Sequence, residues 1–254
     1  MSKARQQSGL SILTLNIHKG FASLRSRLVL ERLRDAVRAV RADVVLLQEV
    51  LGEHRRFARQ HPEWPDQSQY EYLADRIWHH YSYGRNAAYT DGHHGNAVLS
   101  KWPIRRERNV DLSVGSHEPR GLLHCELEKP GSDSVWHVMS VHLGLWARER
   151  RVQVARIAEH MRTAVGAREP VVLGGDFNDW SGRQGATLSR EAALREAHLE
   201  QHGRLARSFP VWCPLLPPDR IYLRTLRVQQ VRRLNGPPWR GLSDHLGLIA
   251  SVQP

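Results

Sequence analysis

The sequence predicts an α/β fold, in which apolar strands alternate with amphipathic helices. Residues 43–48 and 171–175 are nearly continuous apolar runs, as expected of strands that are covered on both faces. Residues 28–41 space their apolar side chains along one face of a helix. Hydrophobic residues form 41% of the 254-residue chain, enough to fill a sizeable core. No linker interrupts the pattern, so we expect one domain over residues 1–254, with residues 1–9 flexible.

The remaining elements follow from the same periodicities and from turn residues. The expected strands, in chain order, span residues 10–17, 43–48, 95–100, 122–128, 135–142, 171–175, 221–228 and 246–252. The expected helices span residues 28–41, 146–163 and 185–198, with helical turns at 70–76. The sequence Pro-Gly-Ser-Asp at residues 130–133 indicates a turn between two of these strands, and the Pro-rich residues 213–218 must form a loop. Residues 52–91 are otherwise too irregular to assign.

Charge and cysteine content restrict the partners and the compartment. A net charge of +11 and a pI of about 10.4 favour polyanionic partners such as nucleic acid, anionic lipid head groups or phosphorylated small molecules. Cys125 and Cys213 are too few for a disulfide framework, and no Cys/His cluster indicates zinc. No apolar run is long enough for a signal peptide or a membrane span. We expect a cytoplasmic protein, with peripheral binding at the inner face of the membrane as an alternative, and infer no obligate protein partner.

The segment VVLGGDFND, residues 171–179, is the most informative part of the chain. An apolar strand breaks on two glycines and then presents Asp176 and Asn178. Open α/β sheets place their chemistry at such strand ends. A carboxylate and a carboxamide two residues apart supply a general base or metal ligand and an orienting group, as attack on a phosphate requires. A strand followed by an ordinary Asx turn is the alternative.

Four other strand ends carry polar side chains of the same kind. A carboxylate next to an apolar strand, as at Glu49, is costly to bury unless it is paired or bound to a metal, whereas the alternative is that it reaches solvent. A lone histidine such as His142 is more commonly a core or surface residue than a catalytic one. The set as a whole nevertheless indicates a site, and it comprises Asn16, His18, Glu49, His142, Asp244 and His245 in addition to the pair above.

The ordered motifs of the chain resemble those of the endonuclease/exonuclease/phosphatase superfamily. These motifs are LTLNIHKG, LLQEV, GNAVLSKWPI, SVHLGL, GGDFND, DRIY and SDHLGL, and they run from residue 10 to residue 250. The superfamily includes DNase I, abasic-site endonucleases, neutral sphingomyelinases and inositol-phosphate phosphatases, and the chain most resembles its small bacterial members. The resemblance implies a four-layer α/β sandwich, in which two packed mixed β-sheets are flanked by helices. This DNase I-like fold agrees with the strand and helix pattern above.

The resemblance also implies a metal site. Glu49 corresponds to the principal Mg²⁺ ligand, Asn16 lies beside it, and Asp244 stands where a second metal-side carboxylate is expected. Oxygen ligands suit Mg²⁺, for which Mn²⁺ can substitute. No HExxH motif or closely spaced histidine pair favours zinc, with the adjacent His93-His94 as the exception. His18 stands where abasic-site endonucleases carry an acid. That departure puts a second metal site and abasic-site activity in doubt.

The catalytic and substrate-binding residues follow from the resemblance in the same way. It implies that Asp176 activates or orients the attacking water and that Asn178 holds the phosphate or that water. It further implies phosphoryl contacts by His245, which Asp219 orients. His142 corresponds to a general acid proposed for the DNase I branch. The remaining candidates are substrate contacts, namely Arg120, His94 and Asn96, with a solvated loop as the alternative for the His93-His94 segment.

These observations predict a divalent-metal-dependent hydrolase that cleaves phosphodiester bonds with activated water. The preferred interpretation is a nuclease acting on DNA. It is supported by the basic charge and by three arginines at the start of a predicted helix, Arg148, Arg150 and Arg151. Runs of arginines on a helix are, however, commonly solvated. The alternative is a phospholipid or sphingolipid phosphodiesterase, or an inositol-phosphate phosphatase, at a membrane surface. It requires exposure of the apolar residues 209–218, which otherwise belong to the core. A non-catalytic polyanion-binding module has no reason to keep a base, an acid and a metal ligand together.

Overall fold

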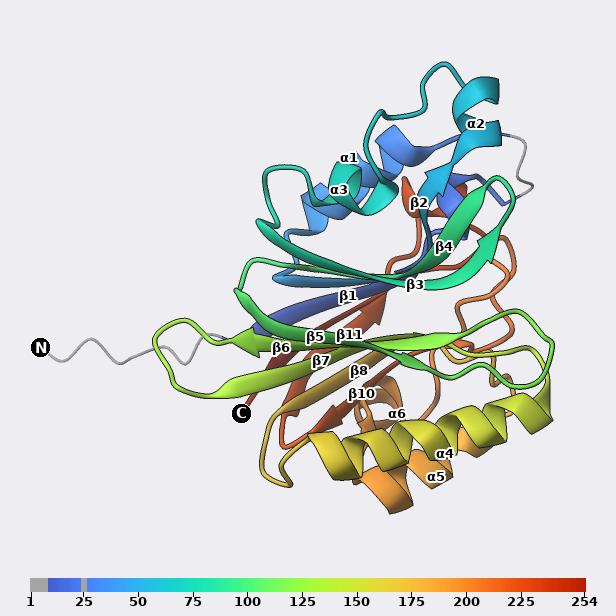
Figure 1. Ribbon diagram of the computed structural model, residues 1–254. Helices are drawn as coiled ribbons and strands as arrows, with labels where there is room; N and C mark the ends of the chain where they lie inside the picture. Colours follow the sequence, from blue (N-terminus) through green and yellow to red (C-terminus); the bar gives the residue numbers. More distant parts are fainter. Residues whose placement is uncertain (1–8, 24–26) are drawn as a thin grey trace, which may run out of the picture.

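The computed structural model describes residues 9–23 and 27–254 and contains two six-stranded sheets that pack face to face, with helices on both outer faces (Figure 1). The four-layer α/β sandwich that the sequence predicts is confirmed. Of the terminus expected to be flexible, residues 1–8 lie outside the described residues and Gly9 is exposed. Among the helices in the described part of the chain, none has the length and apolar character needed to cross a membrane.

The first sheet has the strand order β11-β12-β1-β2-β4-β3 and is mixed, because only β1 and β2 pair in parallel. Its outer face is covered by α1 and α3 (Figure 1). The strands are β1 (Leu10–Asn16), β2 (Val44–His54), β3 (His80–Tyr89), β4 (Gly92–Ser100), β11 (Arg227–Arg233) and β12 (Leu248–Gln253). The helices on this side are η1 (His18–Gly20), α1 (Leu30–Val40), α2 (Arg55–Gln60) and α3 (Gln69–Ala74).

The second sheet has the strand order β5-β6-β7-β8-β10-β9, and here only β7 and β8 pair in parallel. Helices α4 and α5 cover its outer face (Figure 1). The strands are β5 (Ile104–Asp111), β6 (Gly121–Glu128), β7 (Val135–His142), β8 (Val171–Asp176), β9 (Arg195–Glu196) and β10 (Asp219–Arg224). The helices are α4 (Ala147–Ala164), α5 (Arg183–Ala192) and α6 (Ala197–His202), followed by the short η2 (Trp239–Gly241) before β12.

Three apolar clusters separate the four layers. Along β1, Leu13 and Leu15 pack towards α1, whereas Leu10 and Ile12 face the second sheet. This alternation is the two-residue period of a strand with both faces covered. Continued to the end of the strand, it places Asn16 on the inner face, between the two sheets. Polar residues at the ends of these buried strands therefore meet inside the sandwich.

Two predicted elements are wrong because backbone reversals lacking a glycine or proline signal divide them. The helix expected at residues 185–198 ends at Ala192, because Ala193 adopts a left-handed conformation with φ of 53°, and β9 and α6 follow. The strand expected at residues 221–228 is two strands in different sheets. β10 ends at Arg224, Thr225 turns the chain with φ of 58°, and β11 begins at Arg227.

Other elements were not predicted, and two of them are edge strands. β5 and β3 lie at the edges of the two sheets, and most side chains of β5 are exposed. An exposed edge strand carries polar residues and lacks the apolar run that the prediction uses. Helix α2 has no buried residue and was missed for the same reason. The turn at residues 130–133 and the loop at residues 213–218 form as expected.

A chain of buried histidines links the second sheet to α4. His124 Nδ1 lies 2.9 Å from His160 Nε2, and His124 Nε2 lies 2.8 Å from His137 Nδ1. The chain ends at Glu169, whose Oε2 is 2.9 Å from His137 Nε2. Burial, reinforced by His137 and His160, lowers the pKa of His124 to about 3. The folded protein therefore resists protonation of this imidazole.

We expect this histidine to make the fold acid-sensitive. The unfolded chain takes up the proton near pH 6.5 and folded His124 only near pH 3, so stability falls as the pH drops through this interval. For this group alone, the free energy of unfolding at pH 5 should be about 2 kcal/mol lower than at pH 7. In urea unfolding, the difference in free energy of unfolding between pH 7 and pH 5 should be smaller for His124→Gln than for wild type. For the exposed His79→Gln it should equal that of wild type. Equal pH effects in wild type and His124→Gln would contradict this assignment.

Candidate active site

The candidate site lies at the end of the sandwich opposite to the C-terminus (Figure 1). The parallel pairs β1–β2 and β7–β8 bring the ends of β1, β7 and β8 and the middle of β2 to this edge, and β10 begins there because it runs antiparallel to β8. A pocket of about 260 Å³ opens between these ends and is lined by side chains from both sheets and from the loop before β12. Parallel pairing thus explains why residues far apart in the sequence converge.

On the second sheet, strand register places three side chains in a row. His142 pairs with Asp176 across β7 and β8, and Asp176 pairs with Asp219 across β8 and β10. The row depends on Gly175, which has φ of 148° and whose absent Cβ would overlap with the Val141 carbonyl oxygen. Only glycine allows the backbones of β7 and β8 to meet here.

On the first sheet, a β-bulge directs Glu49 into the site. Leu47 pairs with Ala97 and Val50 with Gly95, so two residues of β2 face one residue of β4. Glu49 itself adopts a left-handed φ of 56°. In a regular strand its side chain would share the outer face with Leu47, but the bulge turns it towards β1. Its Oε1 accepts a hydrogen bond of 3.2 Å from the Asn16 amide.

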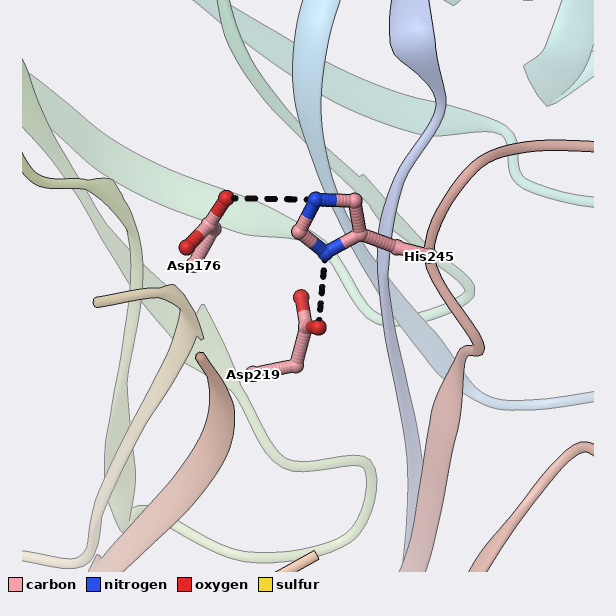
Figure 2. A group of neighbouring side chains, drawn as sticks. All are labelled: Asp176, Asp219 and His245. Atoms are coloured by element: carbon pink, nitrogen blue, oxygen red, sulfur yellow. Dashed lines mark hydrogen bonds and ion pairs between the residues drawn. The ribbon is translucent and has the colours of Figure 1, made fainter. Parts of the chain in front are cut away.

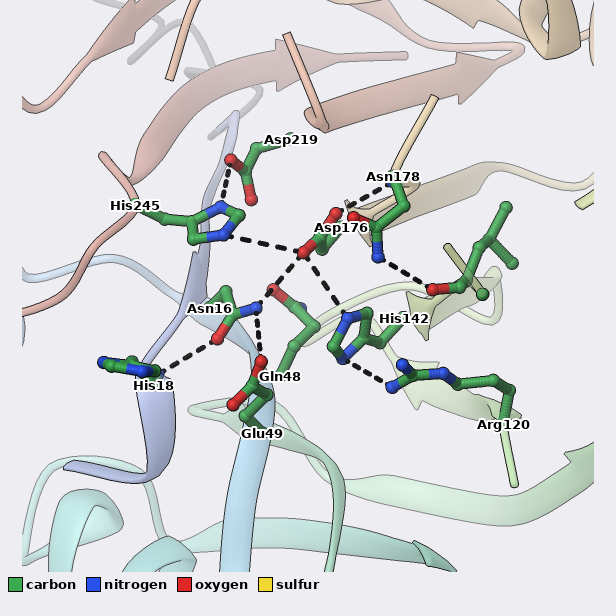
Figure 3. Close-up of polar contacts among 12 residues, drawn as sticks. Asn16, His18, Gln48, Glu49, Arg120, His142, Asp176, Asn178, Asp219 and His245 are labelled. Carbon is green, nitrogen blue, oxygen red and sulfur yellow. Dashed lines mark hydrogen bonds and ion pairs between the residues drawn. The ribbon is translucent and has the colours of Figure 1, made fainter. Parts of the chain in front are cut away.

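Asp176 is the centre of the polar network (Figure 3). Its Oδ2 is 3.2 Å from Asn16 Nδ2, 3.5 Å from His142 Nε2 and 3.8 Å from His245 Nε2. Its Oδ1 accepts a 2.9 Å hydrogen bond from the Asn178 backbone N–H. Burial raises the pKa of Asp176 to about 6, although the His245 charge opposes the rise. A carboxylate whose pKa is close to neutrality suits proton abstraction from water.

Asp219 holds His245 in place (Figure 2). Its Oδ2 lies 2.8 Å from His245 Nδ1 and also accepts a 2.5 Å hydrogen bond from the Ser208 hydroxyl. Burial lowers the pKa of His245, but the carboxylates of Asp219 and Asp176 outweigh it and raise the value to about 10. The site therefore contains an imidazolium, whose Nε2 points at Asp176.

The second imidazole, His142, is neutral, whereas His245 is cationic. Arg120 Nη1 lies 3.2 Å from His142 Nδ1, so that nitrogen is the acceptor and Nε2 carries the proton. Burial and the Arg120 charge hold the pKa of His142 well below its ordinary value. The resting imidazole is a neutral hydrogen-bond donor, and the general-acid role that the resemblance implies would first require it to gain a proton.

Of the residues predicted to contact the substrate, three line the pocket and one does not. Arg120 and His94 line the pocket, where they hold Glu118 at distances of 2.7 and 3.3 Å. Asn178 also lines it, and its Nδ2 donates to the Leu143 carbonyl at 2.9 Å. Asn96 is not among the lining residues.

The Asn96 amide connects the two sheets instead. It donates to the carbonyl oxygens of Gly121 and Ser140 at 2.9 and 3.3 Å. With both contacts made to backbone oxygens of the second sheet, this side chain has a structural task, and its predicted contact with substrate gains no support from its position.

Two groups of side chains could hold a cation, and their chemistry differs. Asp176, Asp219 and His245 offer ligand atoms within 4.8 Å of one another, but Asp219 Oδ2 and His245 Nδ1 already contact each other through a hydrogen bond. Glu49 Oε2 is buried without a hydrogen-bond partner, and Glu49 and Asp244 line the same pocket. Asp219 Oδ1 is buried without a partner as well, so the choice between the groups depends on ligand type. Oxygen donors without an imidazole fit a hard divalent cation, and we regard the Glu49 side as the better site.

Asn16 and His18 border that side. The Asn16 amide nitrogen faces both carboxylates, while its Oδ1 accepts a 3.0 Å hydrogen bond from the His18 backbone N–H. His18 Nε2 lies 3.9 Å from Asp244 Oδ2. Six other lining residues were not predicted as site residues, although Lys19 and Leu145 were part of quoted motifs: Lys19, Glu118, Leu145, Trp180, Phe209 and Pro218.

Comparisons with known proteins identify the family of the chain. Residues 13–245 match the Endonuclease/Exonuclease/phosphatase family, and the chain belongs to it. It is 46% identical over 252 residues to the YbhP protein of Escherichia coli K12, covering 99% of both chains. That similarity confirms the predicted kinship with small bacterial members of the family. Family membership makes the protein a phosphoesterase-type hydrolase.

Solved structures share the fold at lower identity. An endonuclease/exonuclease/phosphatase of Beutenbergia cavernae has a TM-score of 0.76 and 21% identity, covering 97% of this chain and 72% of that one. TDP2 of D. rerio, complexed with a single-strand DNA product, has a TM-score of 0.72 and 16% identity over 97% of this chain and 100% of that one. A mannosyl-6-phosphatase of Bacteroides thetaiotaomicron has a TM-score of 0.71 and 15% identity over 96% and 99%. At these identities the comparison establishes the fold alone.

The close approach at Gly175 gives a test of the site's construction. Gly175→Ala should lower the free energy of unfolding by more than the ~1–2 kcal/mol of a left-handed alanine, because the new methyl group also meets the Val141 carbonyl. Gly131→Ala is the matched control, since Gly131 has φ of 73° but nothing within 4 Å. Urea unfolding of both variants measures how much free energy the φ of 148° and the contact with Val141 together cost beyond that of a left-handed alanine. Equal losses would show that β7 and β8 do not require the glycine.

Proposed function

We propose that the protein is a divalent-metal-dependent phosphodiesterase that cleaves its substrate with activated water. The observation that carries this proposal is the position of the buried Asp176 carboxylate, with a cationic imidazole at His245 on one side and the carboxylate of Glu49 on the other. A base, a fixed positive charge and an oxygen-rich cation site within one pocket are the groups that phosphodiester hydrolysis needs.

In the proposed mechanism each side chain has one task. Asp176 accepts the proton of the attacking water, and Asn178 orients that water or the phosphate. His245, held by Asp219, stabilises the negative charge that develops on the phosphoryl oxygens. Arg120 and the neutral His142 face the same pocket and donate hydrogen bonds to the substrate.

In this proposal Glu49 and Asp244 would hold the cation, and Asn16 would join them only through its Oδ1, which in this structure accepts the His18 N–H. A bound Mg²⁺ or Mn²⁺ supplies additional positive charge for the transition state. The orphaned oxygen of Glu49 and the absence of sulfur ligands among these three residues support a hard cation over zinc.

DNA is one candidate substrate, supported by the net charge of +11. The similar TDP2 structure holds a single-strand DNA product. The predicted arginine face is smaller than expected, however, because Arg150 is buried and donates to the carbonyl oxygens of Gly144 and Leu145. Arg148 and Arg151 remain exposed. Of the three arginines on which the DNA-binding face was predicted, one is therefore a structural residue.

A phospholipid phosphodiesterase is the second candidate, supported by the apolar segment 209–218. The expectation that this segment belongs to the core is wrong at its tip, where Trp212 is 75% exposed and Leu215 59% exposed. Exposure is the condition under which the segment can enter a membrane interface. A protein acting there would be peripheral to the membrane, at its cytoplasmic face if the predicted compartment holds.

Hydrolysis of bis(p-nitrophenyl) phosphate, a soluble phosphodiester, tests the proposed chemistry directly. Activity should require Mg²⁺ or Mn²⁺ and should disappear in excess chelator. Glu49→Gln should lower kcat/KM by roughly two to four orders of magnitude, because it removes the charge of the principal ligand.

Glu53→Gln is the matched control, since Glu53 lies on the same strand but is exposed and paired with Arg55. It should retain wild-type activity. Full turnover in chelator, or a Glu49→Gln variant within about threefold of wild type, would exclude the metal mechanism.

A further inference from the structure

Three adjacent loops at the pocket carry exposed apolar side chains. The loops follow β7 and β8 and precede β10, which are neighbouring strands whose corresponding ends share one edge of the sheet. We call their five exposed side chains the apolar rim: Leu145 at 62%, Trp146 at 64%, Trp180 at 51%, Trp212 at 75% and Leu215 at 59% exposure. Exposed large apolar groups are ordinary when scattered, but a set gathered around one pocket indicates a binding surface.

The rim is continuous with the candidate active site. Leu145 and Trp180 line the pocket itself. The loop that carries Trp212 is fastened to the catalytic residues, because the Phe209 ring lies 4.8 Å from the His245 ring and the Val211 N–H donates to the Asp244 carbonyl at 2.8 Å. A partner bound to the rim would therefore contact residues that line the pocket.

The backbone of residues 209–218 is suited to an environment without water. Four of these ten residues are prolines, which have no N–H, and none has a charged side chain. Of the six remaining N–H groups, those of residues 209, 211, 213, 215 and 216 donate to carbonyl oxygens of the protein. The hydrocarbon region below the head groups penalises unsatisfied backbone groups, whereas nucleic-acid contacts use free N–H groups and basic side chains on phosphates.

The charges beside the rim favour an anionic surface. Exposed arginines flank each apolar loop in the sequence, namely Arg148, Arg183 and Arg207. Residues 143–148, 180–183 and 207–218, all within the described part of the chain, include no acidic residue. Tryptophan and arginine prefer the head-group region, and leucine the acyl boundary below it.

We propose that the apolar rim docks the protein on an anionic phospholipid bilayer and so presents a lipid phosphodiester to the pocket. This substrate class rests on the proposed phosphodiesterase function. Single-stranded nucleic acid is the competing partner, because tryptophans also stack on bases. Leu145 and Leu215 cannot stack, and the hydrogen-bonded loop offers phosphates few donors, so the bilayer is the better fit.

Co-sedimentation with vesicles tests the docking without any turnover. The full-length protein, in chelator, is mixed with vesicles of phosphatidylcholine alone or with an equal amount of phosphatidylglycerol. Binding should be strong only to the anionic vesicles and should weaken with salt. Because hydrolysis is not measured, failure of docking leaves the proposed chemistry untouched, and failure of the chemistry leaves docking untouched.

Variants then assign the binding to the rim. Trp212→Ser and Leu215→Ser should each lower the vesicle partition coefficient by about fivefold or more, since each removes apolar area from the interface. The matched controls are Leu199→Ser, in α6, and Tyr81→Ser, in β3, whose side chains are 47% and 43% exposed away from the pocket. They should bind like wild type, and thermal unfolding should confirm that all four variants are folded.

Three results would overturn the proposal. The first is no binding to anionic vesicles, and the second is binding that the rim variants and the controls reduce equally. The third is tight binding of single-stranded oligonucleotides that Trp212→Ser weakens while vesicle binding stays unchanged. That last outcome would assign the rim to base stacking and would favour the nuclease.

Discussion

The structure of this site depends on burying the carboxylate of Asp176 where the two sheets meet. A buried carboxylate is strongly unfavourable unless hydrogen bonds and charges compensate it. Its compensating partners come from separate parts of the chain: Asn16 from the first sheet, His142 from the second and His245 from the loop before β12. The sandwich must therefore close correctly before the carboxylate is stabilised, which couples the fold to the chemistry.

Local backbone distortions complete this arrangement. Glu49 and Asn178 adopt left-handed conformations, and Gly175 occupies a region that only glycine tolerates well. Each distortion costs conformational energy. Gly175 and Asn178 lie at the end of β8, and Glu49 lies in the bulge within β2, beside the same pocket. The buried sheets hold these residues in place. The packing of the apolar clusters thus stabilises the strained backbone at the end of the sandwich that contains the pocket.

Sequence patterns predicted the buried elements, because burial requires a regular pattern of apolar residues. Strands such as residues 135–142 were found with their boundaries because both faces are covered, and the motif residues Asp176 and His245 meet as the resemblance implies. The bulge that orients Glu49 was not predictable, because it is a shift in the pairing of β2 with β4 and leaves no pattern in the sequence of β2 itself. Exposure also depends on tertiary packing, and for this reason the burial of Arg150 and the exposure of Trp212 became apparent only in the structure.

In the proposed site the cation binds on the Glu49 side of Asp176 and not between Asp219 and His245. Crystals grown with Mn²⁺ and measured for its anomalous scattering would locate the cation. We expect a single strong peak within coordination distance of Glu49 Oε2, with the hydrogen bond between Asp219 and His245 intact. A peak bound by Asp219 and His245, or no peak at saturating Mn²⁺, would contradict the account.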